Sequence, residues 1–330
     1  MLLFVAHDPG AKNKIRPVYE HALSLGLDAE FIDLNEKREL MNSADAQEFV
    51  ENREATAAIL GCSANQGEWA LIRACEAFGV PTGMVVDIGT LIKIDSMTPE
   101  DFPRRFMVSN QLCYNEVAGL GADSAIVTVT GDCDLEALSN IGDPGEKDLV
   151  RKHYGLSKDS PVISFFCSPI TQDAIDALVS LGELLPRTGI DRPALIVRPH
   201  PRTPHLETLE MVCQPYPFMR FDAEGHISNR SLLCASVFSL SMASTVTLES
   251  LVLGIPSAFF QVDWDYIEQD RLYRNLVDVA RIRTEQQLHE FVASAVRNDG
   301  RALIGNVENH RGALARTWQV VEELMASRLD

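Results

Sequence analysis

The sequence lacks the features that mark a secreted, membrane or zinc-binding protein. Its seven cysteines are scattered, odd in number and form no Cys-x-x-Cys pair, which argues against a disulfide framework and a zinc site. No stretch approaches the roughly 18 uncharged apolar residues of a membrane span. The apolar start of the chain ends after six residues at His7-Asp8, too soon for a secretory signal. We therefore expect a soluble, cytoplasmic protein with reduced thiols.

Basic charge is also scarce. Lysine and arginine number 29 against 47 acidic residues, a formal net charge of -18, whereas a general nucleic-acid binder would carry a basic balance. We therefore expect no nucleic-acid partner. The deficit is uneven: residues 1–150 hold 11 basic and 25 acidic residues, and residues 151–330 hold 18 and 22. No lysine follows Lys158; arginine is the better phosphate partner, although a GC-rich genome produces the same bias.

Several catalytic and cofactor motifs are missing. The sequence holds no Walker A loop, no His-Glu-x-x-His and no Gly-x-Ser-x-Gly. A Gly-x-Gly-x-x-Gly is also absent; the nearest match, Gly119-Leu120-Gly121, follows a predicted helix and precedes a predicted strand, the wrong context for dinucleotide binding. We therefore expect neither a cofactor nor a bound metal.

Buried strands and helices alternate along the chain. Its 330 residues exceed what one hydrophobic core organises, which predicts two domains. Repeated strand–helix units imply right-handed crossovers and an α/β fold of two Rossmann-like, doubly wound parallel-sheet domains that face a cleft. The turn-rich stretch 141–146 (IGDPGE) is the best linker, giving domains at 1–140 and 147–307, with a helix at 308–330 that packs back on the first. The expected strands are 2–6, 29–34, 57–60, 81–86, 107–109 and 124–129, then 162–166, 194–197, 218–221, 236–240 and 257–260.

The strongest local signal is the segment from Arg198 to Arg202 (RPHPR), which follows a predicted strand. Ligands bind at the carboxyl ends of strands in open α/β sheets, and the two prolines would hold the loop rigid. The Arg198 guanidinium suits a diphosphate, and His200 suits a hydrogen bond to phosphate or proton transfer. The alternative is a solvated turn in which His200 bonds the backbone.

A second signal lies at the start of the helix predicted for 244–253. Its unpaired N–H groups and positive dipole end make an anion site, to which Ser244 or Thr245 could add a hydroxyl. Glu249 lies one turn on and could accept from a ribose diol. The equally weighted alternative is an ordinary N-cap supported by Glu249. Ser168, after the first strand of the second domain, is a further phosphate candidate.

Weaker candidates follow strands of the first domain. His7-Asp8-Pro9-Gly10 is a short turn where Gly10 would admit a substrate close to the backbone, or simply a tight strand–helix turn. Ser63 follows the third strand and precedes a helix, which it is expected to cap. Asp87 could face the site as a base or cap a turn.

The order of these segments resembles the GT-B superfamily of nucleotide-sugar enzymes, in particular UDP-N-acetylglucosamine 2-epimerases and capsular polysaccharide or teichoic-acid-type transferases. The resemblance spans residues 1–260, although the short HDPG turn replaces a Gly-rich loop and the residues of the epimerase site do not align. The segments that carry it are HDPG (7–10), ILGCSANQGEWALIRACEAFGVPTGMVVD (59–87), VSNQLCYNEVAGLGADSAIVTVTGDCDLEAL (108–138), RPHP (198–201) and SMASTVTLESLVLGIPSAFF (241–260).

This resemblance implies a metal-independent glycosyltransferase of surface-polysaccharide or glycoconjugate synthesis. Ser244 and Thr245 would contact the donor phosphates, Glu249 the ribose, and Arg198 or His200 the diphosphate. Asp87 or His7 would activate the acceptor, a glycan or small molecule. The expected acceptor-side residues are Asp8, Gly10 and Ser63. Two alternative functions are a UDP-N-acetylglucosamine 2-epimerase and a non-catalytic nucleotide-sugar binding protein. For the oligomeric state, a homodimer is one of the possibilities.

Overall fold

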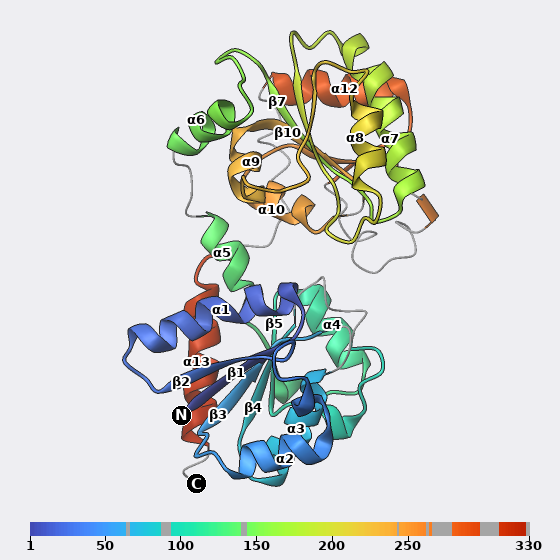
Figure 1. The fold of residues 1–330 in the computed structure, drawn as a ribbon. Helices are drawn as coiled ribbons and strands as arrows, with labels where there is room; N and C mark the ends of the chain where they lie inside the picture. The colour runs from blue at the N-terminus through green and yellow to red at the C-terminus, as the bar shows by residue number, and fades with distance from the viewer. Residues whose placement is uncertain are drawn as a thin grey trace. The chain divides into compact units, whose positions relative to one another are not determined.

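A computed structural model describes residues 1–63, 67–86, 94–139, 144–242, 244–261, 264–265, 279–297 and 310–327. The chain divides into two compact units, Met1–Ala137 with Glu308–Asp330, and Leu138–Val307. Each unit is built around one parallel six-stranded sheet with helices on both faces (Figure 1). The predicted α/β fold of two Rossmann-like, doubly wound sheets is therefore confirmed.

The first sheet has the strand order β2-β1-β3-β4-β5-β6. β1 pairs in parallel with both β2 and β3, and Leu2 lies opposite Ala29 on one side and Ala57 on the other. The strand order reverses between β1 and β3, which makes this pair the topological switch point where open α/β sheets bind ligands. The strands are β1 (Leu2–Ala6), β2 (Ala29–Asp33), β3 (Ala57–Leu60), β4 (Thr82–Val86), β5 (Arg105–Val108) and β6 (Val127–Val129).

Successive side chains of β1 enter opposite cores, as the two-residue period of a strand requires. Leu3 and Val5 pack with α2, α3 and α4, whereas Phe4 and Ala6 pack with α1 and α13. Because both faces are covered, the strand is apolar throughout. The helices of this unit are α1 (Pro9–Ser24), α2 (Ser43–Glu51), α3 (Gly67–Ala77), α4 (Gln111–Gly119), α5 (Cys133–Ser139) and α13 (Ala313–Ala326), with short 3-10 turns η1 (Arg38–Met41), η3 (Pro99–Asp101) and η4 (Ser124–Ile126).

Helix α13 lies directly on a glycine of the sheet. A Cβ on Gly83 would stand 2.8 Å from Leu324 Cδ1 and 2.8 Å from Met107 Cε, both buried. Replacing Gly83 by alanine is therefore expected to lower the free energy of unfolding by about 1–3 kcal/mol, as overpacking does. Urea unfolding of this variant is compared with that of Gly119→Ala, where the added carbon meets no atom within 4 Å apart from its chain neighbours and the backbone of its own helix. Equal midpoints would contradict the close approach of α13.

The second sheet has the order β12-β11-β10-β7-β8-β9. Here the order reverses between β7 and β10, so their carboxyl ends form the switch point of this unit. Phe166 pairs with Ser241 of β10 on one side and with Arg198 of β8 on the other. The strands are β7 (Val162–Phe166), β8 (Ala194–Arg198), β9 (Met219–Phe221), β10 (Ser236–Ser241), β11 (Ser257–Phe260) and β12 (Ala280–Ile282).

Two helical layers cover this sheet. Ile163 and Phe165 of β7 pack in the core beneath α7, α8 and α12, and Val162 and Phe166 pack beneath α6, α9 and α10. The helices are α6 (Pro144–His153), α7 (Thr171–Leu184) with the 3-10 turn η5 (Leu185–Thr188), α8 (Leu206–Cys213), α9 (Asn229–Ala235), α10 (Val246–Val252) and α12 (Glu285–Val296).

Three local expectations differ from the structure. The strand expected from Ser124 starts at Val127, because Asp123 accepts from the Ala125 N–H and winds the preceding residues into a 3-10 turn. The strand β12 was not anticipated, since its three residues are too few for an alternation pattern. The last three residues of the expected linker, 144–146, belong to α6, which begins at Pro144; residues 141–143 lie outside the described residues. Over the part of the chain that the structure describes, no helix has the length and apolarity to cross a membrane.

Candidate functional site

The first candidate site lies at the switch point of the first sheet. His7 and Asp8 follow β1, and Ser63 lies just beyond β3, so the two loops meet at adjacent strand ends. The Ser63 hydroxyl oxygen accepts hydrogen bonds from the backbone N–H groups of Asp8 at 3.0 Å and His7 at 3.3 Å. Asn35, after β2, donates to the His7 carbonyl at 2.7 Å. The HDPG loop is thus held by the neighbouring strands on both sides.

His7 and Asp8 form an imidazole–carboxylate pair. The His7 Nδ1 lies 2.9 Å from Asp8 Oδ1, and the two side chains are 21% and 25% exposed. An ionised carboxylate only accepts hydrogen bonds, so Nδ1 donates and the lone pair of the neutral imidazole lies on Nε2. A partly exposed imidazole held in this tautomer can take a proton from a hydroxyl.

Glu68 also contacts the HDPG loop, and it was not predicted as a site residue from the sequence. It lies in the first turn of α3 and is fully buried. Its Oε1 accepts from the His7 N–H at 3.1 Å and closely from the Ser63 hydroxyl. Burial raises the pKa of Glu68, and the Asp8 charge raises it further. A single acidic residue in the apolar run GEWALI is the one signal that could have drawn attention to it.

Among the described residues, the Ser63 hydroxyl contacts the HDPG loop and Glu68, while residues 64–66, which precede α3 and bear on the expected cap, lie outside the described residues. Gly10 is the second residue of α1, and apart from its chain neighbours and the backbone of its own helix no atom of the protein lies within 4 Å of where its Cβ would be. Asp87, the other expected base, lies outside the described residues.

The second candidate site lies at the switch point of the other sheet. Ser168 follows β7, His200 follows β8, and Ser244 precedes α10 after β10; these three strands are neighbours. Backbone hydrogen bonds continue past the strand ends, from Met242 N–H to the Phe166 carbonyl and from Cys167 N–H to the Arg198 carbonyl, each 2.9 Å. The topology thus brings the three expected phosphate-side loops to one edge of the sheet.

Arg198 corrects one expectation, because its guanidinium is not displayed at this edge. Its Nη2 donates to Asp222 Oδ2 at 2.6 Å and to the Ile227 carbonyl at 2.8 Å, and its Nη1 donates to Asn229 Oδ1 at 3.0 Å. Tyr154 donates to the same Asp222 oxygen. With both terminal nitrogens bound to protein oxygens, Arg198 ties β8, β9, α6 and α9 together and offers no fork to a diphosphate.

The surroundings of His200 are compatible with both roles expected for it, a group that contacts phosphate or transfers a proton, and a residue that bonds the backbone of its turn. Its Nδ1 accepts from the Arg202 N–H at 3.1 Å, as in the backbone-bonded turn. Burial lowers the pKa of His200, and the Arg202 charge lowers it further. The imidazole is therefore neutral at neutral pH and carries its proton on Nε2, which makes it a donor.

The serine and threonine side chains at the two loops have different surroundings. Ser168 is buried, and its hydroxyl accepts from the Ile170 N–H at 3.0 Å. Ser244 is half-buried and accepts from the Val246 N–H at 3.3 Å. Thr245 is exposed and its side chain makes no cap, so the expected Thr cap is absent. Glu249 is half-buried on α10.

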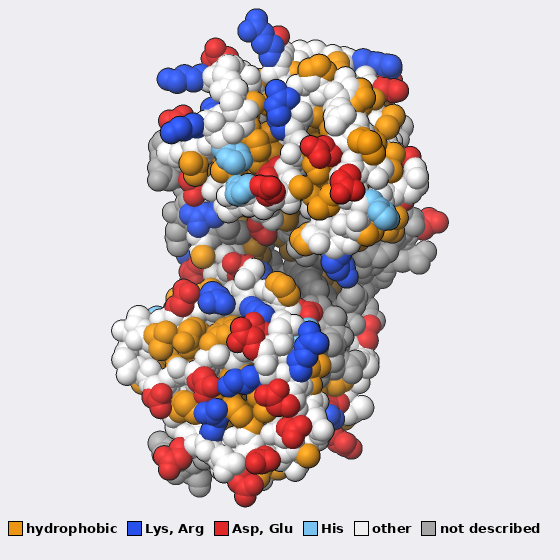
Figure 2. All heavy atoms as spheres, in the orientation of Figure 1, with side chains coloured by type: hydrophobic (Ala, Val, Ile, Leu, Met, Phe, Trp, Pro, Cys, Tyr) orange, Lys and Arg blue, Asp and Glu red, His pale blue; other side chains and the backbone are white. Residues whose placement is uncertain are grey.

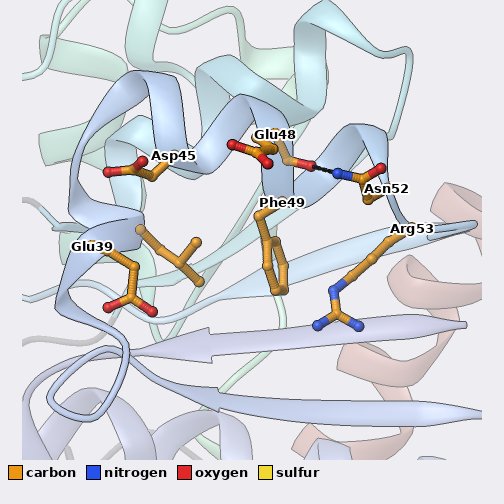
Figure 3. A pocket seen from close by; sticks show the side chains of 7 residues that line it. Glu39, Asp45, Glu48, Phe49, Asn52 and Arg53 are labelled. Carbon is orange, nitrogen blue, oxygen red and sulfur yellow. Dashed lines mark hydrogen bonds between the residues drawn. The ribbon is translucent and has the colours of Figure 1, made fainter.

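On the face that Figure 2 shows, acidic and basic side chains are mixed over the first unit and form no basic region. A shallow hollow of about 470 Å3 beside α2 is lined by seven residues, of which three are acidic and one, Arg53, is basic. The Arg53 guanidinium carbon lies 4.1 Å from the centre of the Phe49 ring (Figure 3). Among the described residues, no group of three or more His, Cys, Asp or Glu side chains is placed to hold a metal ion.

Comparison with known proteins adds structural relatives only. No protein-family model and no curated protein matches the chain. It is similar to a UDP-GlcNAc 2-epimerase from Neisseria meningitidis bound to UDP-GlcNAc (TM-score 0.68, 13% identity, 98% of this chain and 99% of that one). It is also similar to a glycosyltransferase from Rickettsia africae (TM-score 0.61, 10% identity, 98% of each chain) and to the wall teichoic acid polymerase TagF (TM-score 0.63, 12% identity, 100% and 90%). The chain therefore has the GT-B fold that the order of its motifs predicted.

Proposed function

We propose that this protein is a nucleotide-sugar enzyme, and specifically a glycosyltransferase that moves a sugar from a nucleotide donor to an acceptor hydroxyl. The observation that carries the proposal is the His7–Asp8 pair at the switch point of the first sheet. It is the arrangement that an enzyme needs to remove a proton from an attacking hydroxyl. Two of the similar structures, the Neisseria meningitidis epimerase and TagF, were solved with UDP-GlcNAc and CDPG respectively, which supports a nucleotide-linked substrate here.

In this reaction the acceptor oxygen attacks the anomeric carbon and its proton passes to His7 Nε2. The bond from that carbon to the donor phosphate breaks, and the electron pair leaves with the phosphate. Negative charge develops on the leaving group, where the Nε2–H of neutral His200 and the hydroxyl and backbone groups of Ser244 and Thr245 would stabilise it. Glu249 would accept from the ribose. Ser168 would orient the loop beside the phosphates, and Asp8, Gly10 and Ser63 would line the acceptor side.

Nucleotide binding is the first test. At a concentration of 100 times its dissociation constant, a nucleotide stabilises the protein by about 2.7 kcal/mol, which raises the melting temperature by roughly 5–10 °C. A thermal-shift panel of UDP, CDP, GDP and CMP identifies the base. Glu249→Ala is expected to weaken the preferred nucleotide about tenfold, the loss of one hydrogen bond to a charged group.

The control for that variant is Glu210→Ala, an exposed glutamate on α8. Unchanged affinity in Glu249→Ala would remove its ribose role, and no shift with any nucleotide would remove the proposed function as a whole.

A second candidate is a UDP-GlcNAc 2-epimerase, because that activity names several of the similar structures. Incubation with UDP-GlcNAc alone separates the two. An epimerase converts the sugar with no acceptor present, a transferase consumes the donor only when an acceptor is added, and a non-catalytic binding protein consumes none.

A further inference from the structure

Glu68 is a buried acid that the proposed reaction does not use. The side chain is fully buried, and its Oε2 has no hydrogen-bond partner among the described residues. The other buried side chains of α3 are apolar, for example Trp69 and Leu71. A carboxyl group in such surroundings is expensive to bury, so its place in the core calls for a reason beyond packing.

The contacts of its other oxygen supply that reason. Glu68 Oε1 accepts the hydroxyl proton of Ser63 and the backbone N–H of His7. A serine hydroxyl has one proton, and here it is donated to Glu68, so the lone pairs of Ser63 face the amides of His7 and Asp8. Glu68 and Ser63 together therefore hold the backbone of both members of the imidazole–carboxylate pair.

We propose that Glu68 is a positioning residue for His7, which it holds through the His7 amide and Ser63 so that Nδ1 stays on Asp8 and Nε2 keeps its lone pair as an acceptor. The inference rests on the proposed function, in which Nε2 takes the acceptor proton. His7 and Asp8 are adjacent in sequence, and without an anchored backbone their side chains have many alternative rotamers. Glu68 itself is too deeply buried to touch a substrate.

The protonation of Glu68 fits this role. Because burial raises the pKa of Glu68, the group retains a proton to a higher pH than an exposed glutamate. A protonated carboxyl still accepts hydrogen bonds through its carbonyl oxygen, and the side-chain oxygen of glutamine can do the same. Glutamine is therefore expected to replace Glu68, and alanine is not.

The test reads the tautomer of His7 directly. Nitrogen-15 NMR of histidine-labelled protein, near pH 8 where an ordinary imidazole is neutral, gives the ratio of the Nδ1–H to the Nε2–H form; His7→Gln assigns the signal. We expect Glu68→Ala to lower this ratio about fivefold, the effect of losing one net hydrogen bond. Glu68→Gln should keep the ratio, and so should Glu76→Ala, an exposed glutamate on the same helix.

Each outcome decides the proposal. A folded Glu68→Ala protein with the parent ratio overturns it, and so does a Glu68→Gln protein that shifts as far as the alanine variant. If Glu68→Ala does not fold, Ser63→Ala, which removes the acceptor of the Asp8 amide, takes its place with the same expected shift. The measurement needs no substrate. A shifted tautomer combined with full turnover in His7→Gln would therefore disprove the base role and leave the positioning role intact.

Discussion

Replacing Asp222 by alanine is expected to lower the free energy of unfolding of the second unit by about 3–5 kcal/mol, the range for a buried ion pair that loses one partner. The Arg198 and Asp222 side chains are 12% and 5% exposed, so water cannot replace the lost carboxylate. Tyr154 would lose its acceptor in the same step. Hydrogen exchange at the amides of β7 and β8 measures the effect within this unit, which whole-protein unfolding would average over both.

Two further variants make that result interpretable. Glu224→Ala, an exposed acidic residue of the same loop, should change the free energy by less than about 0.5 kcal/mol. The double variant Arg198→Met, Asp222→Leu should recover more than half of the loss, because apolar residues of similar size can replace a buried pair. Equal losses in Asp222→Ala and Glu224→Ala would mean that the network does not stabilise the unit.

The second large effect is expected on turnover. His7→Gln should lower the rate of sugar transfer by about 10²–10⁴-fold, the range for losing a general base, while nucleotide affinity stays unchanged. Glutamine preserves the polarity and approximate size of the side chain but cannot take the proton. The measurement is donor consumption with the nucleotide sugar that the thermal-shift panel selects.

The matched control is His21→Gln. His21 lies on α1, the helix that begins at Pro9 of the HDPG segment. His21 packs its ring edge-on against Trp318 of α13, 4.9 Å between ring centroids, and has no part in the proposed reaction. Its turnover should stay near that of the parent protein. If His7→Gln retains parent turnover as well, the proton passes to another group and the assignment of His7 fails.

The fold class could be predicted because its signals are local. Apolar runs such as Leu2–Ala6 mark strands buried on both faces, and a glycine with positive φ, Gly26, stands just after the end of α1. The apolar runs also show where each strand ends, and His7 and Ser63 were candidates because they come just after the ends of β1 and β3. Their approach at one switch point needed only the parallel strand order.

Side-chain partners far apart in the chain could not be predicted. Arg198 and Asp222 are 24 residues apart, and His7 and Glu68 are 61 apart, with no spacing rule to connect either pair. The RPHP motif therefore predicted that the Arg198 guanidinium binds a diphosphate, whereas in the structure it donates to oxygens of Asp222, Ile227 and Asn229. Glu68 escaped notice because a helix pattern shows which face is buried and carries no sign that one acid lies on that face.

The packing of α13 on Gly83 bears on how the protein is made. The helix is synthesised after the whole of Leu138–Val307, yet it completes the core that covers β3, β4 and β5. At ordinary ribosomal rates the sheet waits roughly 10–30 s for this cover. During that interval an apolar surface is open to chaperones and to other nascent chains. The core of the first unit therefore cannot be completed until the whole of the second unit has been synthesised.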